Sequence, residues 1–143
     1  MIFDPDSFLY LELEESSTEY VIIPAGTHAA FIESQEIKSG ISDKGYKWYL
    51  LETKWCITDP AVLEEMQRKT VYITQRIFLE IDPLSGKLVT GKGRNWQLGR
   101  LRAAVGKPKG PLADLVGCNA RIEVKHRLWE GKLQEDVRSV TAG

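Results

Sequence analysis

Two segments of the chain alternate between apolar and polar side chains with a period of two residues. In residues 46–58, one face of this alternation consists of Tyr49, Leu51, Thr53, Trp55 and Ile57. In residues 71–81, the matching face consists of Val71, Ile73, Ile77, Leu79 and Ile81, with Gln75 as its polar member. Because successive side chains of a strand point to opposite faces of a sheet, both segments are predicted to be β-strands with these faces in the core.

Weaker strand signals lie on both sides of these segments. They cover residues 20–23, 27–38, 120–125 and 133–140. Glu130-Gly131 provides a glycine for the turn of the last hairpin, where a positive φ is needed. About five strands without regular alternation of strand and helix fit a small Greek-key barrel better than βαβ units. The predicted fold is therefore mainly β, an OB-fold-like five-stranded barrel.

One or two short helices and a helical turn are expected between the strands. Asp59 is a suitable N-cap and Pro60 suits the first helical position, which predicts a helix that ends near Lys69. Asn95 is expected to cap a second helix that runs to about Val105. Leu98, Leu101 and Val105 form the core stripe of that helix. Residues 111–116 are expected to form a further helical turn.

The length and composition indicate a single soluble domain. The chain has 143 residues, of which 43% are hydrophobic and 27% are charged. No apolar run approaches the ~20 residues of a membrane span, and the N-terminus lacks the pattern of a secretory signal. No membrane association is therefore expected. Cys56 and Cys118 are expected to be reduced and partly buried.

Charge is distributed unevenly along the chain. Residues 1–36 contain eight acidic residues and no Lys or Arg, whereas the remaining residues hold all 19 Lys and Arg against 12 of the 20 Asp and Glu. Residues 1–19 are interpreted as an acidic N-terminal arm with a strand-like alternation at Leu9, Leu11 and Leu13. Residues 20–143 are interpreted as the barrel domain.

The strongest local asymmetry is the segment 83–113, which contains no acid. Its cations are Lys87, Lys92, Arg94, Arg100, Arg102, Lys107 and Lys109. A glycine-rich loop at 91–94 leads into the second predicted helix. The simplest partner for such a segment is a polyanion.

No constellation in the sequence indicates catalysis or a cofactor. His28 and His126 are isolated, and no Cys-x-x-Cys or paired histidines at metal spacing occur. Residues 91–94 lack the Gly-Lys-Ser/Thr ending of a phosphate-binding loop. We therefore expect a protein that is not an enzyme and has no metal or cofactor.

Binding of single-stranded nucleic acid requires a positive groove and exposed aromatic rings. Aromatic side chains at Trp48, Tyr72 and Phe78 share the outward parity of the two long strands and are predicted to stack on bases. Arg76 belongs to the same predicted platform. The predicted phosphate contacts are Lys87, Lys92, Arg94, Arg100 and Arg102, with Lys125, Arg127 and Lys132 of the last hairpin as a second wall. Glu52 and Glu80 on the same outward face would repel phosphate. The alternative is that these residues form core and ordinary solvated faces.

The chain resembles a family of small bacteriophage single-stranded DNA-binding proteins with an OB-fold. The segments that carry the resemblance are residues 3–9, 24–27, 91–95, 97–102, 124–127 and 131–133. The resemblance implies that the protein coats single-stranded DNA during phage replication or recombination, in the cytoplasm of the infected bacterium. It also implies replication or recombination proteins and further copies of the chain as partners. Unlike many such proteins, this chain ends in Val140-Thr141-Ala142-Gly143 and not in acidic residues.

Two other functions remain as alternatives to DNA binding, and the arm has two possible roles. The first alternative is an interaction module that docks a phage or host protein through its acidic arm and exposed aromatics. A nuclease would need a metal-binding carboxylate cluster, which Glu80, Asp82 and Asp114 do not evidently form. The arm, with its acids and apolar residues, either competes with DNA for the groove or exchanges between subunits.

Overall fold

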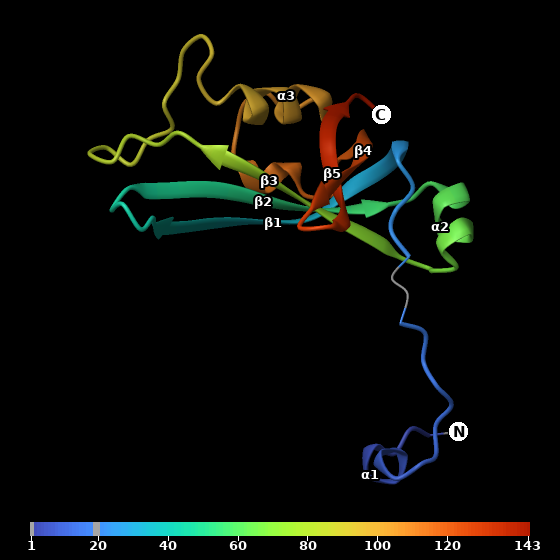
Figure 1. Cartoon of the computed structure of the whole chain (residues 1–143). Coiled ribbons are helices and arrows are strands. Elements are labelled where there is room, and N and C mark those ends of the chain that lie inside the picture. The colour runs from blue at the N-terminus through green and yellow to red at the C-terminus, as the bar shows by residue number, and fades with distance from the viewer. Residues whose placement is uncertain (1, 19–20) are drawn as a thin grey trace.

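The computed structural model describes residues 2–18 and 21–143 of the chain (Figure 1). In chain order the elements are α1 (Pro5–Leu9), β1 (Gly26–Ile41), β2 (Lys47–Ile57), α2 (Pro60–Met66), β3 (Val71–Leu79), α3 (Trp96–Ala104), the 3₁₀ helix η1 (Leu112–Leu115), β4 (Asn119–Trp129) and β5 (Lys132–Thr141).

The five strands form one antiparallel sheet in the order β3-β2-β1-β4-β5. The two end strands of this order, β3 and β5, approach each other, and α3 lies against both of them. Within the described residues, the hydrogen-bonded ladders join only the neighbours in that order, so the sheet is open between β3 and β5. The prediction of a mainly β protein with few short helices is confirmed.

The core lies on the face that the period-two pattern predicted. Leu51, Thr53, Trp55 and Ile57 of β2 are buried, as are the inward apolar residues of β3. Gln75, the polar exception of β3, accepts a hydrogen bond from Nε1 of the Trp55 indole at 3.0 Å. A buried indole N–H without an acceptor would be costly, which gives this polar residue a structural role.

The second predicted helix has the predicted stripe but not the predicted cap. In α3, Leu98 and Leu101 are buried and Val105 packs against the core. Asn95 adopts a left-handed conformation with φ 52° and its side chain makes no capping hydrogen bond. The Asn95 side chain instead binds the end of β3, so the expectation of an N-cap was wrong. Helix α2 begins at Pro60 as predicted but ends at Met66, because Gln67 is left-handed with φ 51°.

The structure of the N-terminal arm differs from its predicted alternation. Pro5–Leu9 forms α1, whose N-cap Asp4 accepts hydrogen bonds from the backbone N–H of Asp6 at 3.2 Å and the Ser7 hydroxyl at 2.8 Å. A capped turn with proline at the first position therefore replaces the predicted strand at its start, and residues 11–18 have no regular secondary structure. Figure 1 shows α1 lying apart from the sheet.

The strand predicted at 20–23 is also wrong where it can be assessed. Tyr20 lies outside the described residues, and Val21–Ile23 is not a strand. Instead the buried Ile23 is held by side chains of the last hairpin. Its N–H donates to Oε2 of Glu135 at 2.6 Å, and its carbonyl oxygen lies 2.6 Å from Nε2 of His126. The backbone N–H and carbonyl of Ile23 are thus satisfied by side chains, and not by the backbone hydrogen bonds of a neighbouring strand.

Both cysteines are free thiols, as expected. Cys56 is buried and Cys118 is half-buried, and burial raises the pKa of the Cys56 thiol. Across residues 2–18 and 21–143, no helix is both long enough and apolar enough to cross a membrane.

Candidate nucleic-acid interface

A groove of about 860 Å³ lies where the sheet is open, between α3, β3 and β5. Four arginines line it, and they come from four different elements. They are Arg76 of β3, Arg100 of α3, Arg127 of β4 and Arg138 of β5. The lining also includes the Trp96 indole and one carboxylate, that of Asp136. The groove therefore combines concentrated positive charge with an aromatic ring, which are the two features that single-stranded nucleic acid requires.

The position of Trp96 depends on Asn95. The Asn95 Oδ1 accepts a hydrogen bond from the N–H of Glu80 at 2.8 Å, and its Nδ2 donates to the carbonyls of Glu80 at 3.0 Å and Val89 at 2.8 Å. This side chain fastens the start of α3 to the end of β3. Trp96, the first residue of α3, is consequently held at the mouth of the groove with 54% of its surface exposed.

The four arginines differ in whether they pair with a carboxylate. Arg76 is paired with Glu52 at 3.1 Å, and Arg127 is paired with Asp136 at 2.5 Å. For Arg100 and Arg138, no ion pair forms among the described residues. The Arg100 guanidinium lies 4.8 Å from the centre of the Trp96 ring, a cation–π contact that leaves its N–H donors available.

Arg138 reaches the groove because of an irregularity in β5. The register of β4 and β5 shifts between Glu123↔Ser139 and Val124↔Val137, so Arg138 is the extra residue of a β-bulge. A bulge leaves one residue unpaired and redirects its side chain. The exposed Arg138 side chain thereby joins the residues that line the groove.

A smaller hollow of about 200 Å³ continues the groove past Trp96. Phe78, Glu80 and Gly93 contribute to its lining, and Trp96 and Gln97 line both hollows. Phe78 is 66% exposed. The two hollows therefore share Trp96 and Gln97, with Phe78 in the smaller one and the four arginines in the larger one. Together they are called the trough.

The other predicted aromatics lie outside this trough. The Trp48 ring covers Gly40 so closely that a Cβ on Gly40 would come within 2.5 Å of it. Tyr72 lies beneath the Lys54 ammonium, 4.3 Å from the ring centre. Neither ring lines either hollow. Of the three aromatics that the sequence placed on the outward face of β2 and β3, only Phe78 therefore lines a hollow.

Charge on that outward face is also balanced. Glu52 lies between Lys38 and Arg76, with N–O distances of 3.1 Å to each. The hydrogen bond from Lys38 and the positive charges of Lys38 and Arg76 lower the pKa of Glu52. A carboxylate held ionised between two cations occupies the donors that a phosphate would need.

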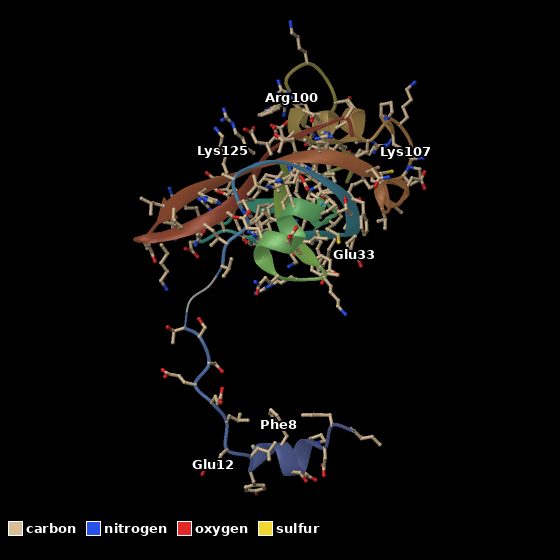
Figure 2. All side chains as sticks on the ribbon, turned by 90° about the vertical axis from the view of Figure 1, so that its right-hand side faces the viewer. Phe8, Glu12, Glu33, Arg100, Lys107 and Lys125 are labelled. Atoms are coloured by element: carbon tan, nitrogen blue, oxygen red, sulfur yellow. The ribbon has the colours of Figure 1, made fainter. Side chains whose placement is uncertain are left out.

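The remaining predicted cations are spread over the surface. Arg94 pairs with Glu80 at 2.5 Å, and Arg102 donates to the carbonyl oxygens of Lys107 at 2.9 Å and Gly110 at 2.7 Å, which closes the loop after α3. The lysines at 87, 92, 125 and 132 are exposed and line neither hollow. Figure 2 shows Arg100 on the α3 ribbon and Lys125 on the last hairpin, both on the side of the molecule opposite the arm.

The structure thus gathers four of the twelve predicted residues into the trough, namely Arg76, Arg100, Arg127 and Phe78. The sequence interpretation missed Trp96, Gln97 and Arg138. Trp96 precedes Arg100 by four residues, a spacing that places both on one helix face and was available as a signal. Arg138 had no such signal, because a bulge depends on pairing with β4.

The groove lining provides guanidinium donors, an indole and the Asp136 carboxylate. Within the described parts of the chain, no three His, Cys, Asp or Glu side chains gather in the manner of a metal site. No protein-family model matches the chain, and no curated protein matches it significantly.

Proposed function

We propose that the chain binds single-stranded DNA without catalysis and with little sequence preference. The observation that carries this proposal is the groove in which Trp96 is half exposed and in which Arg100 and Arg138 have no carboxylate partner among the described residues. Arginines that neutralise phosphates release the counterions condensed on the nucleic acid, which favours binding at low salt. An indole stacks on any base because every base has a π-face.

The position of Trp96 in the groove distinguishes single-stranded from duplex DNA as the ligand. An ordinary duplex presents its bases edge-on inside the grooves, where a single tryptophan on a helix N-terminus cannot stack on them. A single strand exposes both base faces and backbone to the same trough. Single-stranded DNA is therefore favoured over duplex DNA as the ligand.

We further propose that the sheet is the OB-fold form of a five-stranded barrel. The order β3-β2-β1-β4-β5, the approach of β3 to β5 and the position of α3 between β3 and β4 all support this assignment. The groove would then lie at the seam of the barrel. A role in phage replication or recombination within the infected bacterium is proposed from the sequence resemblance alone.

Titration with a fluorescent dT oligonucleotide of about 16 nucleotides tests the proposal, since one OB-fold occupies ~4–16 nucleotides. The logarithm of the affinity should fall linearly with the logarithm of salt concentration, by ~0.7 per phosphate neutralised. The tryptophan emission should be quenched on binding, because Trp96 is accessible for stacking. An absence of binding at low salt would refute the proposal, and equal affinity for a duplex of the same length would refute the preference for single strands.

A further inference from the structure

The arm and the groove are complementary in charge and in chemistry. Residues 2–18 contain five acidic residues and no Lys or Arg. The groove contains four arginines against one carboxylate. The arm thus offers the same type of ligand as a nucleic acid, with carboxylates in place of phosphates and apolar side chains in place of bases.

The apolar side chains of the arm are exposed to solvent in the described part of the chain. Every residue from 2 to 18 is exposed, including large side chains at Phe3, Leu9, Tyr10, Leu11 and Leu13. The ring contact between Phe3 and Phe8, with centroids 5.2 Å apart, is internal to the arm. Contiguous exposed apolar surface of this kind marks a contact site.

The base of the arm is fixed to the last hairpin at a residue that does not line the groove. Glu135, which binds the N–H of Ile23, pairs with His126 across the β4–β5 ladder, whereas its neighbour Asp136 pairs with Lys125. The groove is lined by Asp136 and the residues that follow it in β5, but not by Glu135. The arm is therefore attached to β5 just outside the groove. Figure 1 shows α1 and α3 on opposite sides of the sheet.

From these observations we infer that the arm of one copy binds in the groove of a second copy. This inference rests on the groove that the proposed function uses. In extended backbone, Glu12 and Glu14 lie on one side, toward Arg138 of β5, while Leu11 and Leu13 lie on the other side, toward the Trp96 ring of α3. About 35 Å of extended chain separates Ile23 from Glu12, which is enough to reach a neighbouring molecule.

Two copies related by a two-fold axis satisfy both arms at once, which closes the assembly as a dimer. The arm and DNA compete for one groove in this arrangement. Binding of DNA therefore releases the arms, and the dimer dissociates as the groove is filled.

Mixing two full-length variants tests the exchange. One variant carries Glu12→Gln, Glu14→Gln and Glu15→Gln, and keeps the groove. The other carries Arg100→Ser and Arg138→Ser, and keeps the arm. Analytical ultracentrifugation at tens of micromolar protein and low salt should show a dimer for the wild type and a monomer for each variant alone. An equimolar mixture should form a heterodimer, because one intact arm then meets one intact groove.

A control addresses the exposed apolar tip of the β4–β5 hairpin as another docking site for the arm. Trp129→Ala with Leu133→Ser should leave the wild-type dimer intact, and circular dichroism should confirm that every variant is folded. Addition of the dT oligonucleotide should convert the wild-type dimer to a monomer bound to DNA.

The inference is overturned if the folded wild type remains monomeric, if both single variants still form dimers, or if only the hairpin variant disrupts the dimer. The DNA titration of the arm variant gives an independent result. Tight dT binding by that variant together with a monomeric wild type would refute arm exchange and leave the proposed function intact. If the two variants form a heterodimer on mixing but the protein binds no dT, arm exchange is supported and the proposed function is refuted.

Discussion

The outward face of β2 and β3 and the groove beside α3 contain the same types of residue, but differ in whether these residues already have partners. Arg76 belongs to both surfaces, because it pairs with Glu52 and also lines the groove. On the outward face, Glu52 is bound to Lys38 and Arg76, and the Trp48 ring covers Gly40. In the groove, Arg138 has no ion pair among the described residues and Trp96 is half exposed. Composition is therefore a poor guide to a binding surface, because a cation already paired with a carboxylate has little left to offer a phosphate.

The largest expected difference between the two surfaces is electrostatic. Replacing Arg100 and Arg138 together with serine should weaken dT binding by roughly 25-fold at ~0.1 M salt and reduce the salt slope by ~1.4, since two phosphate contacts are lost. Fluorescence titration at several salt concentrations measures both quantities.

Arg68→Ser with Lys69→Ser is the matched control for that variant. It makes the same change in net charge at exposed positions outside the groove, so it should change affinity by less than about 3-fold through the general field. Equal losses in the two double variants would show that overall charge, and not the groove, holds the DNA.

Tryptophan substitutions compare the stacking capacity of the two surfaces. Trp96→Ala should weaken dT binding by about 5–10-fold, near the lower end of the ~1–3 kcal/mol of a stacked base, and leave the salt slope unchanged because no charge is lost. Trp48→Ala should cost less than about 2-fold. Titration of both variants measures the contrast.

Trp129→Ala is the natural control for Trp96→Ala. Trp129 is 55% exposed and lies 5.7 Å from the Arg127 guanidinium, so it closely resembles Trp96 except that it lies outside the groove. A larger loss at Trp48 than at Trp96 would return the stacking platform to the outward face.

A modest gain in dT affinity is expected when the paired cations of the outward face are released. Glu52→Gln should raise dT affinity by up to about 5-fold at ~0.1 M salt, because Arg76 would become available for one more phosphate. Glu65→Gln, which removes the same charge from an exposed position on α2, serves as the control. Equal gains in both variants would indicate a general charge effect.

The same substitution has a pH-dependent effect on stability. Because the folded-state pKa of Glu52 is lowered, its ion pairs stabilise the fold above the unfolded-state pKa, and this stabilisation disappears as the pH falls through the lowered pKa. Thermal unfolding across the acidic range should therefore show a smaller acid loss in Glu52→Gln than in the wild type. An exposed pair of this kind contributes at most ~1 kcal/mol.

Part of the candidate site could be predicted from the sequence. The basic segment that supplies Arg100 was visible as a run without acids, and the parity of β3 placed Arg76 and Phe78 outward, as observed. The pairing of Arg94 with Glu80 was not visible, because those residues are 14 positions apart and meet only when the loop folds back on β3. The capping role expected for Asn95 failed for the same reason.

The sequence by itself determined strands β2 and β3, the stripe of α3 and the turn at Glu130-Gly131, where both residues have positive φ. Each of these depends on local periodicity or on the backbone freedom of a few neighbouring residues. Only the tertiary structure decided which charges remain available. That outcome depends on which distant side chains meet, as at Glu52 and Arg76, and on a bulge in β5 that exists only when β5 pairs with β4.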